Sequence, residues 1–282
     1  MFEKFKESMM VEFDMSDLGL MHYFLGIEMK HSTTEIFISQ KKYEQEILNS
    51  FQMKNCNFVS TPMEMGLKLV KEPDGRKVDN TLYKQIVRSL MYLTTTRPDI
   101  MHVVSLISRY MEHPKEIHLL ATKRILRYLQ GTINFGIFYK KGEKSELFGF
   151  SDSDFAGDPD DRKSTSEFVF MLGSGAVSWS SKKQQIVTLS TTEAEFVAGA
   201  TTIYCDSNSA IKLSKNPVLY GRSKHIDVKF HCLRDLTKDG VIDIVYCRSE
   251  EQVADLFTKP LKMASFVKLR KLLGVCTLED PD

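Results

Sequence analysis

The spacing of hydrophobic residues changes along the chain, and each change predicts a different element. Residues 23–29 and 35–39 are short runs rich in apolar and β-branched side chains, and the turn-prone residues 32–34 separate them. This pattern predicts a β-hairpin. From Gln40 onward the apolar residues recur at helical spacing, so a helix of about three turns should follow. The apolar positions of that helix are Tyr43, Ile47, Leu48 and Phe51.

Prolines, glycines and charges replace the periodic pattern between residues 61 and 80, which marks a linker. Three helices should follow it, because apolar residues step by three and four within 83–91, 100–110 and 121–129. The third helix has a basic side, which is either a solvated surface or a phosphate contact. Its residues are Lys123, Arg124 and Arg127.

The second half of the chain alternates strands with helices. Three strands are predicted first, at 147–151, 168–172 and 177–179. A capping box at residues 190–193 then opens a helix, and a short strand at 203–205 precedes another helix start. Strands and helices in this order predict an α/β fold.

Composition and charge narrow the class of protein. Lys and Arg number 38 against 37 Asp and Glu, so the net charge is +1 and binding to nucleic acid would need a local basic patch. No apolar stretch approaches the roughly 18 residues of a membrane span, and the chain opens with charges. We therefore expect a soluble intracellular protein, cytoplasmic or nuclear, without a targeting signal. The five widely spaced cysteines predict reduced thiols rather than disulfides or a zinc site.

Four acidic residues fall where carboxylates from different elements could meet. Asp152 ends the first strand of the second half, Glu195 lies in the capped helix, Asp206 ends the short strand, and Asp255 opens an apolar run. Carboxyl ends of parallel strands converge at one edge of an α/β sheet. Oxygen ligands there suit Mg²⁺ or Mn²⁺, and two such ions can support phosphodiester cleavage. Acidic strand ends are common, so a solvated rim remains the alternative.

The sequence around these acids resembles a known family. The segments 151–157, 161–166, 177–184 and 221–227 look like the ribonuclease H domain of copia-class LTR retrotransposon Pol polyproteins. Further upstream, 89–93, 96–100 and 123–132 resemble the segment that joins the polymerase to ribonuclease H, and 17–27 resembles the end of the polymerase palm. The polymerase's Tyr-Val-Asp-Asp motif occurs nowhere in the sequence, so DNA synthesis is not expected.

The resemblance implies both a domain plan and a fold. The fold would be a ribonuclease H-like mixed sheet with flanking helices, preceded by a small α+β polymerase remnant and a helical connection. The plan is a reverse transcriptase remnant at 1–60, a linker at 61–80, a helical connection at 81–140, a ribonuclease H-like domain at 146–260 and a tail at 261–282.

The resemblance also implies an activity, which is metal-dependent cleavage of the RNA strand of an RNA–DNA hybrid. The residues that would carry the catalysis and hold two Mg²⁺ or Mn²⁺ ions are Asp152, Glu195, Asp206 and Asp255. Partners would be the hybrid and other parts of a Pol polyprotein, with no membrane. The candidate phosphate contacts, with plain surface charge as the alternative, are Lys182, Lys183, Arg222 and Lys224. The acids without a catalytic match should lie in a solvated turn, and they are Asp154, Asp158, Asp160 and Asp161.

The chain departs from the family between Glu195 and Asp206, where only ten residues, 196–205, separate the two acids. A crossover that includes a helix needs a dozen or more residues. Residues 196–201 as a helix would cover about 9 Å, whereas 202–206 as a strand would cover about 13 Å, which leaves nothing for a turn. The sequence therefore predicts a truncation between residues 200 and 203.

Such a truncation leaves open a catalytically impaired or inactive transposon remnant that keeps at most nucleic-acid binding. A third alternative is an integrase-like DNA strand transferase. The order Asp, Glu, Asp, Asp speaks against it, because that family ends its acidic set with a helical glutamate.

Overall fold

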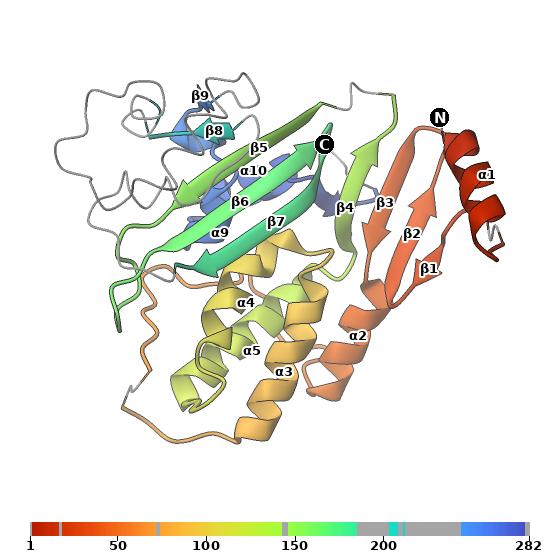
Figure 1. The fold of residues 1–282 in the computed structure, drawn as a ribbon. Helices are drawn as coiled ribbons and strands as arrows, with labels where there is room; N and C mark the ends of the chain where they lie inside the picture. The colour runs from red at the N-terminus through yellow and green to blue at the C-terminus, as the bar shows by residue number, and fades with distance from the viewer. Residues whose placement is uncertain are drawn as a thin grey trace.

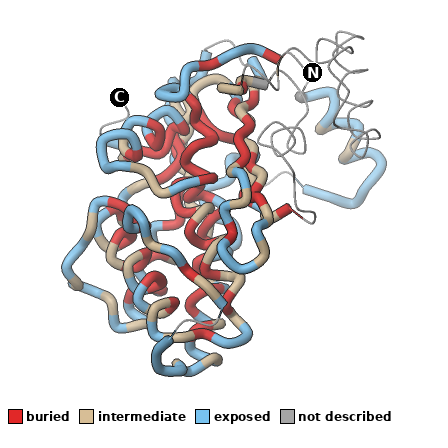
Figure 2. Tube along the Cα trace, turned by 90° about the vertical axis from the view of Figure 1, so that its left-hand side faces the viewer, coloured by how far each residue is buried: buried red, intermediate tan, exposed pale blue. Residues whose placement is uncertain are grey.

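The computed structural model describes residues 2–16, 19–71, 74–142, 146–184, 203–207, 211 and 244–279. Within them the chain forms two five-stranded sheets with helices packed against both (Figure 1). The short helix α1 (Phe2–Glu12) lies at the outer edge of the first sheet. Buried residues form a continuous core between the sheets and the helices (Figure 2). This mixed α/β architecture is the class that the sequence predicted.

The first sheet is antiparallel and has the strand order β1-β2-β3-β4-β10. Its strands are β1 (Tyr23–Phe24), β2 (Ile27–His31), β3 (Glu35–Ser39), β4 (Phe135–Lys140) and β10 (Val275–Thr277). The predicted hairpin is confirmed as β2 and β3. The run 23–29 is not one strand, because Leu25 and Gly26 adopt φ values of 47° and 79° and turn the chain between β1 and β2. Neither β4 nor β10 was predicted.

The four helices predicted between residues 40 and 129 are confirmed and pack together beneath the sheets (Figure 1). They are α2 (Lys41–Ser50), α3 (Asn80–Leu93), α4 (Met101–Ser108), which follows a short 3₁₀ turn at Pro98–Ile100, and α5 (Glu116–Gly131). Two of the three residues on the basic side of α5 are engaged within the protein, whereas Lys123 is exposed. Arg127 Nε donates to the Asn57 carbonyl at 2.7 Å, and Arg124 Nη2 donates to Thr61 Oγ1 at 3.2 Å. These arginines fasten the adjoining segment to the helices.

The second sheet has the order β7-β6-β5-β8-β9. Its strands are β5 (Leu147–Ser153), β6 (Thr165–Leu172), β7 (Gly175–Lys183), β8 (Ile203–Cys205) and β9 (Ile244–Tyr246). The first three are antiparallel neighbours, whereas β8 runs parallel to β5 and β9 runs parallel to β8. The helices α9 (Asp255–Thr258) and α10 (Met263–Leu272) lie behind this sheet (Figure 1). The helices predicted from residues 193 and 209 fall outside the described residues.

The sequence also predicted the absence of membrane spans and the state of the cysteines. In the described ranges, no helix is both long and apolar enough to cross a membrane. The cysteines there, Cys56, Cys205, Cys247 and Cys276, are free thiols, as predicted, and all but Cys56 are buried.

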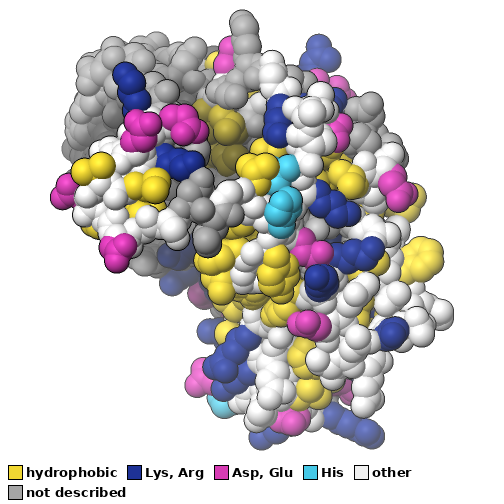
Figure 3. Space-filling view, turned by 90° about the vertical axis from the view of Figure 1, so that its right-hand side faces the viewer, with side chains coloured by type: hydrophobic (Ala, Val, Ile, Leu, Met, Phe, Trp, Pro, Cys, Tyr) yellow, Lys and Arg dark blue, Asp and Glu magenta, His cyan; other side chains and the backbone are white. Residues whose placement is uncertain are grey.

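Large hydrophobic side chains remain exposed near the N-terminus. They are visible on the side of the molecule that carries α1 and β1 (Figure 3). The exposed fraction reaches 87% at Val11 and 68% at Leu20. The set comprises Phe5, Met10, Val11, Phe13, Met15, Leu20, Met21, Tyr23, Phe24 and Leu25. In Figure 3 the hydrophobic side chains on this side lie in several groups, with charged side chains between them.

A fully buried arginine connects the helices with one another and with α10. Arg97, between α3 and α4, donates from Nη1 to Glu44 Oε1 of α2 at 2.6 Å, and from Nε and Nη2 to the two Asp99 oxygens at 2.9 and 2.8 Å. Tyr128 of α5 donates to Asp99 at 2.6 Å and accepts from Arg270 of α10 at 3.0 Å. Burial alone would raise the pKa of Asp99, but the Arg97 guanidinium lowers it below its usual range. We call these five residues the Arg97 cluster.

We expect Arg97→Met to lower the free energy of unfolding by about 3–5 kcal/mol, because Glu44 and Asp99 would stay buried without their cation. Urea titration followed by circular dichroism measures this. Arg88→Met is the matched control, since Arg88 is exposed on α3 and its loss should change stability by less than about 0.5 kcal/mol. Equal effects of the two substitutions would contradict a stabilising role for the cluster.

Candidate active site

Two of the predicted acids lie at the carboxyl ends of neighbouring parallel strands. Phe150 of β5 lies opposite Tyr204 of β8, and Asp152 and Asp206 each follow two residues later. Asp152 is 6% exposed, whereas Asp206 is half-buried and accepts a hydrogen bond from Ser249 Oγ at 3.2 Å. The sequence predicted these two acids on adjacent strands, close enough to share one Mg²⁺. The strand register confirms the adjacency, and the shared metal ion and the roles of the acids stay predictions.

Asp255 approaches Asp152 from the C-terminal part of the chain. It opens α9, which packs on β5 and β6. Thr258 Oγ1 of the same helix donates to Asp152 Oδ2 at 2.5 Å. The Lys259 ammonium lies 2.7 Å from Asp255 Oδ1 and 3.9 Å from Asp152 Oδ2. The single turn of α9 therefore holds an acid and a hydroxyl against the end of β5, and the residue after it brings a cation to the same place.

Asp152 acts electrostatically on Asp255, and all three acids act on the Cys247 thiol. Burial raises the pKa of Asp255 to about 7. The hydrogen bond from Lys259 opposes this rise, and the Asp152 carboxylate adds to it. Burial also raises the pKa of the Cys247 thiol to about 12, with Asp206 and Asp255 contributing in the same direction. Like charges so close together are costly unless a cation or a proton neutralises them.

The donor set fits a hard divalent cation, because carboxylate oxygens are the ligands that Mg²⁺ and Mn²⁺ prefer. The arrangement of the described ligand side chains does not form a complete metal site. Among the described residues, no three His, Cys, Asp or Glu side chains are arranged to hold a metal ion. Glu195, the remaining predicted ligand, lies outside the described residues, as do Arg222 and Lys224.

One carboxyl group beside Asp152 escaped the sequence analysis. Glu167 of β6 lies directly opposite Asp152 in the sheet register and is fully buried. Ser181 Oγ donates to its Oε1 at 2.8 Å, and His102 Nδ1 lies 3.8 Å from the same oxygen. Burial raises the pKa of Glu167 well above its usual range, and Asp152 raises it further. The sequence signal for this buried carboxyl group was a glutamate directly before the apolar residues 168–172 of a predicted strand.

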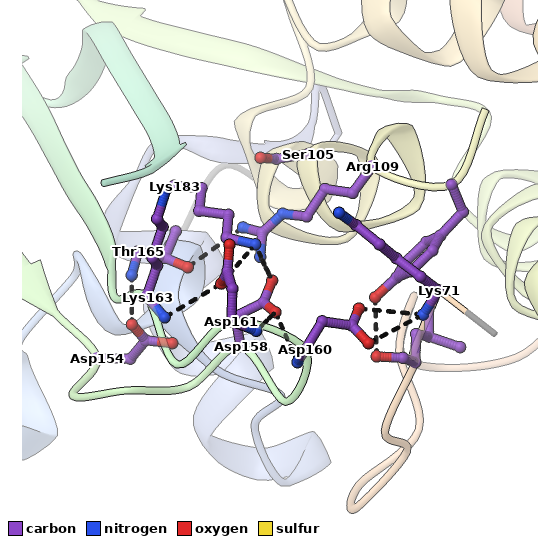
Figure 4. A network of polar contacts seen from close by, with 12 residues as sticks. Lys71, Ser105, Arg109, Asp154, Asp158, Asp160, Asp161, Lys163, Thr165 and Lys183 are labelled. Atoms are coloured by element: carbon purple, nitrogen blue, oxygen red, sulfur yellow. Dashed lines mark hydrogen bonds and ion pairs between the residues drawn. The ribbon is translucent and has the colours of Figure 1, made fainter. Parts of the chain in front are cut away.

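The two described candidate phosphate contacts differ in environment. Lys182 is exposed on β7. Lys183 is engaged within the protein, because its ammonium lies 2.6 Å from Asp158 Oδ2 and 2.8 Å from Asp161 Oδ1 (Figure 4). These bonds raise the pKa of Lys183 despite its partial burial. Of the pair, Lys182 is the one available to a ligand.

The turn at residues 154–161 is only partly solvated: Asp160 is exposed, as predicted, Asp154 and Asp161 are half-buried, and Asp158 is buried. Asp158 is 3% exposed and also accepts from Nη1 of Arg109, the residue after α4, at 3.1 Å. Asp160 accepts from the Lys71 backbone N–H at 3.0 Å (Figure 4). Burial alone would raise the pKa of Asp158, but the hydrogen bond from Lys183 lowers it below its usual value. Asp158 and Asp161 therefore anchor the turn to the basic side chains of Arg109 and Lys183, which lie outside it in the sequence.

Comparisons with known proteins place the chain in a family. Residues 1–65 match the family described as "Reverse transcriptase (RNA-dependent DNA polymerase)". The Pol polyprotein from transposon RE1 of Arabidopsis thaliana is 40% identical over 93% of this chain and 20% of its own length. That from transposon TNT 1-94 of Nicotiana tabacum is 38% identical over 96% of this chain and 23% of its own length.

A shorter relative is matched over most of its own length. An uncharacterised mitochondrial protein of Arabidopsis thaliana is 40% identical over 73% of this chain and 85% of that protein. No solved structure matches the chain. The chain belongs to the copia-type retrotransposon Pol polyprotein family, as the motifs predicted, and it spans about a fifth of the length of the Pol polyproteins that it matches.

Glu167 makes stability depend on pH. Its pKa is raised in the folded protein, so the folded state binds more protons than the unfolded state above pH of about 4.5, and stability falls as the pH rises. Glu167→Gln removes this effect. We expect its melting temperature to equal that of the parent near pH 4.5 and to exceed it by about 2 °C or more at pH 8.

Differential scanning calorimetry across this pH range measures the difference. Glu46→Gln is the control, since Glu46 is exposed on α2 and should give parallel curves. A Glu167→Gln curve that stays parallel to the parent would show that the buried carboxyl does not titrate as described.

Proposed function

We propose that residues 146–260 form a ribonuclease H-like domain that hydrolyses the RNA strand of RNA–DNA hybrids. The observation that carries the proposal is the meeting of Asp152, Asp206 and Asp255 at one end of the second sheet. Three residues predicted from separate motifs of one family converge there. The order β7-β6-β5-β8-β9, with three antiparallel strands followed by two parallel ones, supports the ribonuclease H-like fold.

Each part of the site has a place in this proposal. Asp152, Asp206 and Asp255, together with Glu195, would hold Mg²⁺ or Mn²⁺. When bound, such ions activate a water and stabilise the leaving oxygen of a phosphodiester. Thr258 orients Asp152 through its hydroxyl. The partner would be recognised by backbone shape and 2′-hydroxyls rather than by base sequence, with the exposed Lys182 as a phosphate contact.

Other parts of a Pol polyprotein are the second proposed partner. The exposed hydrophobic residues near the N-terminus lie within the segment that matches the reverse transcriptase family. The matched Pol polyproteins are several times longer than this chain. Apolar surface on a reverse transcriptase segment is what a contact with further polymerase residues would cover.

A catalytically impaired remnant is the alternative function, and the short connection favours it. Only residues 196–205 separate Glu195 from Asp206. A two-metal site tolerates little displacement, because misplacing a catalytic group by about 1 Å can cost roughly 100-fold in rate. Such a remnant would keep the fold and at most nucleic-acid binding.

Asp152→Asn tests the proposed activity directly. We expect Mg²⁺-dependent cleavage of an RNA–DNA hybrid to fall at least about 100-fold, because one charged ligand is lost from the site. Gel analysis of a labelled RNA strand measures the rate. Asp206→Asn should lower the rate to a similar extent. Asp14→Asn should leave the rate unchanged, because Asp14 is exposed and far in sequence from the acids of the site. Equal rates for Asp152→Asn and the parent would assign the cleavage to a contaminant.

Reinsertion of residues distinguishes the active enzyme from the remnant. We expect a variant with about 20 to 25 family-like residues added after Ala200 to cleave hybrids faster and to melt at a higher temperature than the parent, because that length restores a helix and a loop. Rates and melting temperatures are compared side by side. If the parent matches the lengthened variant in both, the truncation argument is wrong.

A further inference from the structure

A lysine ammonium lies where two buried carboxylates come together. Lys259 Nζ is 2.7 Å from Asp255 Oδ1 and 3.9 Å from Asp152 Oδ2. The two carboxylate side chains are 8% exposed, whereas the lysine side chain is 49% exposed. The anions are therefore fixed in the protein, and the cation reaches them from the solvent side.

The surroundings hold the acids in place but leave the lysine able to move. Asp152 is part of β5 and accepts a hydrogen bond from Thr258, and Asp255 lies within α9. Lys259 follows the last residue of α9 and has an extended backbone, with φ −146° and ψ 152°. Its ammonium is carried on a flexible four-carbon stem. Lys259 can therefore leave the carboxylates without any change in the helix or the strand.

The charges near these two acids are incompletely balanced. Two carboxylates face one ammonium, and Asp206 contributes further negative potential at Lys259. Buried anions without a counter-ion are costly, so the ammonium stabilises the metal-free fold. A divalent cation would satisfy the same oxygens with twice the charge.

We propose that Lys259 is a built-in counter-ion of the Asp152–Asp255 pair, which a divalent metal ion must displace in order to bind. This inference rests on the metal-dependent function proposed above. Ammonium and metal ion compete for the same carboxylate oxygens, so Lys259 lowers the affinity for metal while it stabilises the metal-free protein. The displaced ammonium moves into solvent at the rim of the site. Lys259 is thus a positioning residue that sets the metal concentration at which the site fills.

Lys259→Met in the full chain tests the competition, because methionine keeps most of the apolar stem and removes the charge. We expect Mg²⁺ and Mn²⁺ to bind this variant at least about fivefold more tightly than the parent, as measured by isothermal titration calorimetry. Its melting temperature should fall in EDTA and rise more steeply with added Mg²⁺. Lys262→Met is the matched control, since Lys262 is exposed three residues later and has no ion pair with any described residue. It should bind metal as the parent does.

Asp152→Asn separates failure of this inference from failure of the proposed function. If neither the parent nor any lysine variant binds metal, or if Asp152→Asn binds as the parent does, the metal site itself is wrong. If Asp152→Asn abolishes binding but Lys259→Met binds no more tightly than the parent, the metal site stands and the counter-ion role is overturned.

Lys259→Arg keeps the test decisive if Lys259→Met does not fold. Its guanidinium can bond both carboxylates through a rigid fork. We expect metal affinity at least about fivefold weaker than in the parent. Unchanged affinity in this variant would equally overturn the proposal.

Discussion

The buried guanidinium of Arg97 is the interaction on which the rest of the architecture depends. An arginine removed from water must be fully paired, and the partners that pair it come from separate segments: Glu44 from α2, Asp99 from the adjoining turn and, through Tyr128 and Arg270, α5 and α10. Apolar packing alone would tolerate sliding of these helices. A bidentate ion pair does not, since both of its hydrogen bonds require a fixed geometry. The helices therefore offer a fixed surface to the second sheet, where the acidic residues gather.

Local patterns predicted much of the fold. The hairpin β2-β3, the helices α2 to α5 and the strands β5 to β8 were all recognisable from periodicity, because each buries one face against a neighbour. The strand β4 was not, since its partners β3 and β10 come from opposite ends of the chain. The Arg97 cluster was equally hidden. In the sequence, Arg97 beside Pro98 is typical of a solvent-exposed turn between two helices. Only contacts with residues distant in sequence, such as its ion pair with Glu44, make it part of the core.

The candidate site shows the same division between local and tertiary information. Asp152, Asp206 and Asp255 were predicted from motifs, and the expected adjacency of the first two is confirmed by the strand register. Glu167 and Lys259 were missed because their significance depends on contacts with Asp152 and Asp255 across the fold. The prediction that Asp158 is solvated was wrong. Its turn has a polar sequence, and only the contacts with Arg109 and Lys183 in the folded protein bury it. The sequence motifs identified the candidate acids, whereas the pKa of each carboxyl group depends on contacts that form only in the folded protein.

The pairing of β4 with β10 has a consequence for how the chain folds during synthesis. Val275 pairs with Ile137, so one edge of β4 stays open until residues 275–277, well over a hundred residues later, have been synthesised. Contacts between residues so distant in sequence close slowly, because the entropy of a long loop is lost before the contact is gained. An unpaired β4 is meanwhile a template for another strand. The strand β10 therefore covers an edge of the first sheet, and a chain that lacks residues 275–277 would leave β4 open to pairing with other chains.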